Sequence, residues 1–184
     1  MSEQETIITT TQCWVEHWVI GESLCPFAHK PATENRILYQ VSNAQRPKQL
    51  LLELAQALEH LMNTPAQVVE TTLLIHPYVL KDFLAYNAFL DQVDDLLVEM
   101  DLEGVLQVAS FHPDYQFADT DYDDVENFTN RSPYPMLHLI REASIEQAIR
   151  YHPNIEAIPE RNIEQVRSLG LKHIQTLLAH CKGE

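Results

Sequence analysis

The chain has 184 residues, 45% of them hydrophobic, and carries a formal net charge of -15 at pH 7. A chain of this length can bury one hydrophobic core without metal or disulfide support, so we expect a single globular domain over residues 1–184. The negative charge argues against nucleic acid and anionic membranes as partners, because clustered Lys and Arg bind phosphate groups. Between positions 82 and 126 the sequence has no Lys or Arg, so Arg131 follows as an isolated cation.

The three cysteines, Cys13, Cys25 and Cys181, are widely spaced and form no C-x-x-C motif. An odd number without a paired framework is more typical of a reducing cytosol than of an oxidising compartment. The N-terminal residues lack the basic and apolar regions of a signal peptide, and no apolar stretch approaches the ~18 residues of a membrane span. We therefore predict a cytoplasmic protein and assign no role to Cys13 or Cys181.

Strands and helices alternate along the first part of the chain. Apolar residues at helical spacing predict helices at residues 9–24, 47–63 and 80–99. Alternating or continuous apolar runs predict strands at residues 36–42, 68–75 and 104–111. This order favours βαβ units, and hence an α/β domain with a small, mainly parallel or mixed sheet and flanking helices.

The pattern is less regular after residue 111. Residues 112–130 are predicted as a long loop with one acidic helical turn. Ser132 followed by Pro133 is typical of a helix N-cap and N1, and predicts a helix that ends near Glu142. A strand over residues 136–141 is the alternative. A capping-box pattern at residues 144–147 and a proline at position 159 predict two further helices.

Two predicted strands end in the same dipeptide, at His76-Pro77 and His112-Pro113. If both strands belong to one parallel sheet, the two histidines project from the same edge, where open α/β sheets bind ligands. The alternative is that each His-Pro pair simply ends a strand, because proline cannot continue the hydrogen-bond ladder.

A predicted anion site lies at the start of the helix expected after Ser132. Helix N-termini bind anions, and Arg131 can add bidentate hydrogen bonds. The predicted ligand-binding residues are Asn130, Arg131, Ser132, Asp114, Tyr134 and Arg141. Two alternatives give Arg131 a structural role. It pairs with a loop aspartate (Asp119, Asp123 or Asp124), or it joins Asn130 and Tyr134 in hydrogen bonds that hold the loop.

Three residues are candidate catalytic groups: His112 as general base, with His138 and Cys25. The other interpretation of Cys25 is a small buried hydrophobe. His138 and Glu142 would share one face of a helix, so His112, His138 and Glu142 are also candidate ligands for a divalent metal. No H-E-x-x-H or C-x-x-C spacing supports that metal, which makes it a minor alternative.

These residues predict a small-molecule site for an anionic ligand, either binding or hydrolytic, at the C-terminal ends of the strands. Residues 112–135 would close this site. The alternative is a non-enzymatic interaction protein whose acidic face, residues 91–103 with residues 119–126, docks a basic partner.

Four long motifs carry a family resemblance. They are W-x-x-x-W-x-x-G-x-x-L-C-P-F-A at 14–28, T-T-L-L-I-H-P at 71–77, Q-V-A-S-F-H-P-D-Y-x-F at 107–117 and N-x-T-N-R-S-P-Y-P-M-L-H-L-I-R-E at 127–142. Over nearly its whole length the chain resembles the bacterial family named domain of unknown function 1415. The resemblance implies a stand-alone, single-domain bacterial protein. It assigns no activity, cofactor or catalytic residue.

Overall fold

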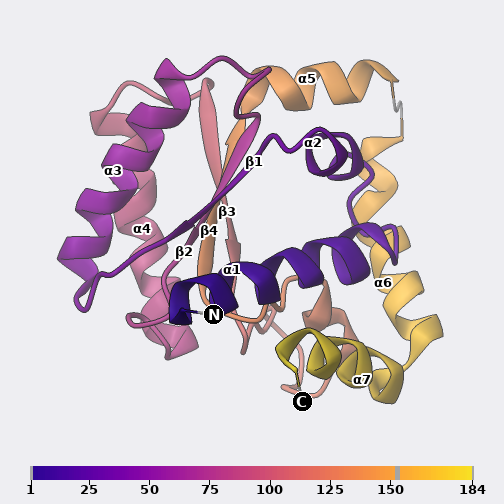
Figure 1. The fold of residues 1–184 in the computed structure, drawn as a ribbon. Helices are drawn as coiled ribbons and strands as arrows, with labels where there is room; N and C mark the ends of the chain where they lie inside the picture. The colour runs from indigo at the N-terminus through magenta and orange to yellow at the C-terminus, as the bar shows by residue number, and fades with distance from the viewer. Residues whose placement is uncertain (1, 152–153, 184) are drawn as a thin grey trace.

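A computed structural model describes residues 2–151 and 154–183, and its centre is a four-stranded mixed sheet with helices on both faces (Figure 1). The strands are β1 (Ile37–Val41), β2 (Thr71–Ile75), β3 (Leu106–Phe111) and β4 (Met136–Arg141). Their spatial order is β1-β2-β4-β3, with β1 and β2 parallel and β4 antiparallel to both of its neighbours. The predicted α/β class is confirmed, and the sheet is the mixed form of the prediction.

This strand order brings several chain ends together. Because β4 runs against both β2 and β3, the strands β1, β2 and β3 all point the same way. The C-terminal ends of β2 and β3 therefore lie at the same edge as the start of β4, where Met136 pairs with both Ile75 and Phe111. We call this the ligand-side edge, and the other end of the strands the far edge.

One face of the sheet is covered by α3 (Pro47–Asn63) and α4 (Phe83–Glu99). Proline at the first position of α3 favours helix initiation at that residue. Leucines at helical spacing in α3 then pack with Tyr86, Phe89 and Val93 of α4 against Leu74 and Leu137 of the sheet. This layer forms the larger hydrophobic core.

The other face is covered by the N-terminal and C-terminal helices (Figure 1). They are α1 (Glu3–Cys13), the π-helix η1 (Trp14–Ile20), α2 (His29–Thr33), α6 (Ile158–Leu169) and α7 (Leu171–Lys182). Ser2 and Glu5 form a capping box that starts α1. Trp14 and Trp18 of η1 are buried against the sheet and the C-terminal helices.

Three elements connect these layers: the 3-10 helix η2 (Val125–Thr129), α5 (Glu142–Tyr151) and the 3-10 turn η3 (Ile155–Ala157). The C-terminal helix predicted from residue 159 is in fact two helices. Gly170, with φ of 76°, separates α6 from α7 in a conformation that favours glycine. No helix in the described part of the chain has the length and apolar character needed to cross a membrane.

The helix predicted from Ser132 to Glu142 is wrong, and the alternative strand is confirmed as β4. Met136–Arg141 is a central strand whose two faces are covered by the two helical layers, so its apolar residues do not alternate with polar ones. The Ser132 hydroxyl donates to the Tyr134 carbonyl at 2.7 Å and does not cap a helix.

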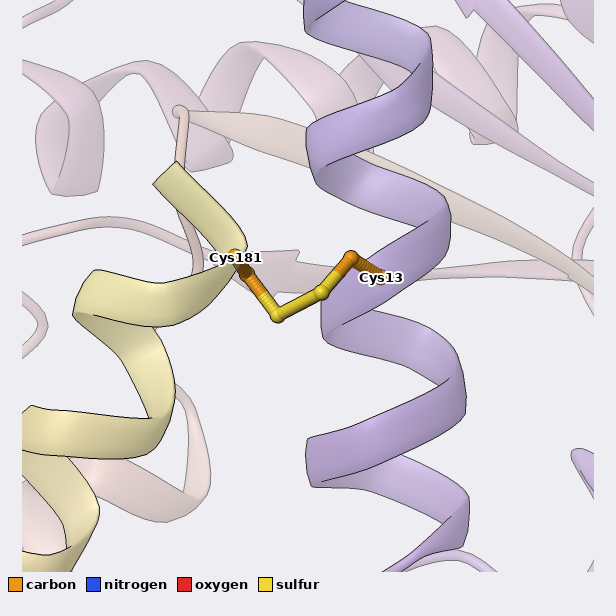
Figure 2. The surroundings of a disulfide bond; sticks show 2 residues. All are labelled: Cys13 and Cys181. Atoms are coloured by element: carbon orange, nitrogen blue, oxygen red, sulfur yellow. A yellow bond between two sulfur atoms is a disulfide. The ribbon is translucent and has the colours of Figure 1, made fainter. Parts of the chain in front are cut away.

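Cys13 and Cys181, to which the sequence analysis assigned no role, form a disulfide bond (Figure 2). The end of α7 packs beside the end of α1, so the two Cα atoms are 5.4 Å apart although 168 residues separate them in sequence. No local motif reveals a pair at this separation. Cys25 remains a free thiol.

Candidate functional site

The segment 112–135, which we call the β3–β4 loop, covers the ligand-side edge. Two indoles of η1 hold this loop; they are four residues apart in sequence, so they lie on the same side of the helix. Trp14 Nε1 donates to the Arg131 carbonyl and Trp18 Nε1 to the Phe128 carbonyl, each at 3.1 Å. Because both indoles are buried, these bonds fix the loop to the N-terminal layer.

Asn127 organises the interior of this loop. Its side chain is 0% exposed, and Oδ1 accepts from the Phe117 amide and the Thr120 hydroxyl, both at 2.9 Å. Its Nδ2 donates to the carbonyls of Asp121 and Tyr122. The sequence analysis did not assign Asn127 a role; the available signal was an asparagine inside an otherwise aromatic and acidic segment.

Arg131 is 5% exposed and makes its hydrogen bonds to backbone carbonyls. Nε donates to Tyr115 at 3.1 Å, and Nη2 donates to Tyr122 at 2.6 Å. The guanidinium carbon lies 4.4 Å from the ring centres of both Tyr122 and Phe128, so cation–π contacts fix its plane. Burial lowers the pKa of Arg131, but an arginine remains charged.

The predicted pairing of Arg131 with Asp119, Asp123 or Asp124 is wrong. Within residues 2–151 and 154–183 its charge forms no ion pair. Its Nη1 also has no hydrogen-bond partner there, while Nε and Nη2 are both used. The loop is indeed held by Arg131, as the structural alternative predicted, but through carbonyls and rings.

A hollow of about 240 Å³ lies beside Arg131, between the β3–β4 loop and α7. The loop contributes Pro113, Tyr122, Asp123, Phe128, Arg131, Ser132 and Pro133; α7 contributes Gln175, Leu178, Ala179 and Lys182. Two cations and one carboxylate therefore line the hollow. An excess of positive charge is unusual in a chain with a net charge of -15. Lys182 was not among the predicted site residues, because its approach to the loop is a tertiary contact.

Two other predicted ligand-binding residues lie close to Arg131 but are already hydrogen-bonded. Asn130 Nδ2 donates to the Ser110 carbonyl at 3.4 Å. The Asp114 carboxylate accepts from the Tyr122 hydroxyl at 2.7 Å, and this bond raises the pKa of Tyr122. Asn130 therefore joins the loop to β3 and Asp114 joins two parts of the loop, and neither residue lines the hollow.

Tyr134 and Arg141 lie elsewhere. Tyr134 packs against the second apolar core, beside the N-terminal helices. Arg141 is at the far edge, where β4 ends, and its Nη2 donates to the carbonyls of Leu61, Thr64 and Val69. Arg141 therefore fixes the connection between α3 and β2, and its burial lowers its pKa.

His76 and His112 lie at the same edge of the sheet, as predicted, but both are 0% exposed. His76 Nδ1 donates to the Val79 carbonyl at 3.0 Å, and His112 Nε2 donates to the Leu80 carbonyl at 3.2 Å. The Tyr86 ring contacts both imidazoles, with centroid separations of 5.6 and 5.1 Å. The two histidines therefore fix the turn that follows β2.

The protonation of these histidines follows from their environment. His112 Nδ1 accepts from the Asp114 amide at 3.0 Å, so both ring nitrogens of His112 are used. His76 Nε2 is buried without a partner in the described part of the chain. Burial lowers the pKa of His76 to about 4 and also lowers that of His112, so both rings are neutral at pH 7.

His138, Cys25 and Glu142 do not join this site. His138 Nε2 bonds the Thr71 hydroxyl at 2.7 Å on the face of the sheet opposite to α4, and burial lowers its pKa to about 4. Cys25 precedes α2, and burial raises the pKa of its thiol. Glu142 begins α5 at the far edge.

This arrangement separates the candidate metal ligands. His138 and Glu142 do not share a helix face, because His138 is on a strand. His112 contacts Phe83 and Tyr86 of α4, on the other side of the sheet from His138. Across the described ranges, no three His, Cys, Asp or Glu side chains gather as a metal ion would require.

These features define an α/β protein with a mixed four-stranded sheet and a cation-lined hollow at its ligand-side edge. The chain belongs to the family described as "Protein of unknown function (DUF1415)", whose model matches residues 6–176. This match confirms the resemblance carried by the four sequence motifs. Neither the curated proteins nor the solved structures contain a match to the chain.

Proposed function

We propose that this protein binds a small anionic molecule, a carboxylate or a phosphate, in the hollow between the β3–β4 loop and α7. The observation that carries the proposal is the state of Arg131. Its guanidinium is oriented by two carbonyls and two rings, it has no carboxylate partner, and it lines the hollow.

Arg131 is suited to this role because its orientation is fixed before a ligand arrives. A guanidinium held in one plane loses little conformational entropy when it binds, and Nη1 is left for an incoming oxygen. The guanidinium is almost fully removed from water, which strengthens its attraction for an anion.

Lys182 supplies a second positive charge from α7, on the opposite wall of the same hollow. Its side chain is exposed and forms no ion pair in the described part of the chain. Phe128 and Leu178 add apolar surface between the two cations. A few polar groups on an apolar wall are typical of small-molecule sites.

Binding is better supported than hydrolysis. A general base needs a free ring nitrogen or carboxylate within reach of the ligand. Both nitrogens of His112 are hydrogen-bonded, and His76 is buried against Tyr86. The carboxylate on the hollow, Asp123, has no hydrogen-bond partner in the described part of the chain that would orient it as a base. We therefore propose a ligand-binding role for this hollow and assign no catalytic group.

The test is calorimetric titration at low ionic strength, with inorganic phosphate and acetate as separate probes. At least one of them should bind saturably. Lys182→Gln should weaken that binding about five-fold, equivalent to about 1 kcal/mol for a lost charge-assisted contact. Lys182 is exposed, so this substitution should leave the fold unchanged.

The matched control is Lys172→Gln, which removes an exposed lysine from the same helix but outside the hollow. It should bind the probe like the wild type. Arg131→Lys should weaken binding further than Lys182→Gln, because lysine cannot reproduce the planar geometry. Equal affinity in the wild type and Lys182→Gln, or saturable binding of neither probe, would contradict the proposal.

A second candidate function is docking of a basic partner on α4. A hollow of about 190 Å³ has Leu51 and Leu96 as apolar lining, with Asp95 and Glu99 beside them. The two acidic stretches of the sequence do not form one face, because α4 leads away from the ligand-side edge that carries residues 119–126. The docking surface is therefore restricted to α4 and its groove with α3.

A basic amphipathic peptide tests this second candidate. It should bind the wild type in a salt-sensitive manner, because the attraction is electrostatic. The double variant Asp95→Lys with Glu99→Lys should not bind it. Equal binding by the wild type and this variant would contradict docking on α4.

A further inference from the structure

We propose that the Cys13–Cys181 disulfide regulates the anion-binding hollow by fixing α7, so that reduction of the disulfide by a dithiol weakens anion binding. This inference rests on the proposed function, because it concerns the same hollow. It adds a chemical signal, thiol–disulfide exchange, that the ligand site alone does not contain.

The geometry places the disulfide directly beside the hollow. Lys182, one of the two cations of the hollow, follows Cys181 in the chain. Leu178 and Ala179, in the preceding turn of the same helix, also line the hollow. Figure 2 shows the bond joining this last turn of α7 to α1. A displacement of that turn would therefore move the α7 wall relative to Arg131.

Besides the disulfide, apolar contacts anchor α7, because Leu177 and Leu178 pack, partly buried, against the second apolar core. Along this helix the buried side chains are Ile174 and Cys181 itself, whereas Lys172, His173 and Gln175 are exposed. The helix follows Gly170, whose φ of 76° ends α6 and changes the chain direction before α7. Ile174 lies in the first turns, so at the end that forms the hollow the buried side chain is Cys181, and its disulfide is the covalent constraint there.

The reaction is ordinary thiol–disulfide exchange. A dithiol thiolate attacks one sulfur of the Cys13–Cys181 bond and forms a mixed disulfide; the second thiol of the dithiol then resolves it. The protein gains two electrons and two protons as two thiols, and the dithiol becomes a disulfide. Cys13 is half-buried, which leaves a path of approach for a small dithiol. Cys25 remains outside this exchange because burial keeps its thiol protonated.

The coupling between the redox state and anion binding must act in both directions. If oxidation strengthens anion binding by some factor, then the bound anion must make the disulfide harder to reduce by the same factor. A ten-fold coupling corresponds to about 30 mV in the reduction potential of a two-electron couple. A disulfide with a solely stabilising role, remote from the ligand, would show no such shift.

The experiment uses the full chain with Cys25→Ser, so that Cys13 and Cys181 are the remaining cysteines. Phosphate and acetate affinities are measured for the oxidised protein and after reduction with dithiothreitol. We expect the affinity to fall about five-fold or more on reduction. Hydrogen exchange should accelerate in residues 171–182 and remain unchanged in α3. Cys13→Ser in the same background, which cannot form the bond, should behave like the reduced protein without any reductant.

The outcomes separate the two proposals. Saturable anion binding that is equal in the oxidised and reduced proteins overturns the redox inference and leaves the proposed function intact. Unchanged hydrogen exchange of α7 on reduction overturns it as well. Absence of anion binding in both redox states overturns the proposed function together with this inference. A reduction potential that shifts with saturating ligand supports both.

Discussion

The two helical layers of this protein cover the same sheet but are held by different interactions. The α3–α4 layer relies on apolar packing, with Leu50, Leu54, Leu58 and Leu61 all 0% exposed. The opposite layer also has an apolar core, but polar side chains that bond backbone carbonyls and a disulfide hold it and the β3–β4 loop as well. The candidate site lies beside the second layer, between the β3–β4 loop and α7.

The largest effect should come from the apolar layer. Leu54→Ala removes a fully buried side chain from between α3 and α4 and leaves a cavity. We expect the free energy of unfolding to fall by about 3–5 kcal/mol, measured by urea denaturation. Because this layer does not line the hollow, phosphate affinity of the folded variant should be unchanged. A loss below about 1 kcal/mol would show that the layer is not held by packing.

The disulfide should give the next effect, in the opposite layer. It joins positions 168 residues apart, so its removal releases a large entropic constraint on the unfolded chain. Cys13→Ser should lower the unfolding free energy by about 2–5 kcal/mol. Cys25→Ser, a substitution at the free thiol, is the control. If dithiothreitol leaves the wild-type melting temperature unchanged, the disulfide does not stabilise this layer.

His76 should make stability depend on pH. Burial lowers its pKa to about 4, whereas an unfolded histidine titrates near pH 6.5. The unfolded chain therefore binds the proton more readily, so the free energy of unfolding falls as pH drops from about 6.5 to about 4. Below about pH 4 His76 causes no further loss of stability. The full contribution is about 3 kcal/mol.

His76→Asn tests this contribution, because the asparagine amide can still donate to the Val79 carbonyl that His76 uses. Its stability should vary less with pH between about 4 and 6.5 than that of the wild type. The exposed His60→Asn variant is the control and should retain the wild-type dependence. Identical pH profiles for wild type and His76→Asn would contradict the assignment.

The smallest predicted effect concerns the loop interior. Asn127→Ala leaves four groups without their hydrogen bond to this side chain. They are the Phe117 amide, the Thr120 hydroxyl and the carbonyls of Asp121 and Tyr122. We expect a loss of about 2–3 kcal/mol, because buried polar groups are left unsatisfied. Phosphate affinity should fall too, since Arg131 donates to the same Tyr122 carbonyl. Asn87→Ala, at an exposed position of α4, should change neither quantity.

The same contrast explains how much the sequence could predict. The boundaries of α3 were predicted correctly, because its leucines follow a helical period over many turns. The placement of His76 and His112 at one edge was also correct, because it follows from strand direction. Both predictions depend on local patterns or on a simple rule of topology.

The remaining features depend on contacts between distant residues. β4 was first predicted as a helix because a strand covered on both faces lacks alternation. The Cys13–Cys181 pair has no local signature, and neither does the approach of Lys182 to the loop. Arg131 donates to carbonyls and not to aspartates because of how the loop folds, and the composition of the loop does not specify that fold.

A crystal structure of the oxidised protein with tungstate, a heavy analogue of phosphate, tests the anion site most directly. We predict tungstate between Arg131 and Lys182, with an oxygen within hydrogen-bond distance of Arg131 Nη1. The Tyr115 and Tyr122 carbonyls should keep their bonds to the guanidinium. Tungstate bound elsewhere, with the hollow filled by ordered water alone, would contradict an anion-binding role for this edge of the sheet.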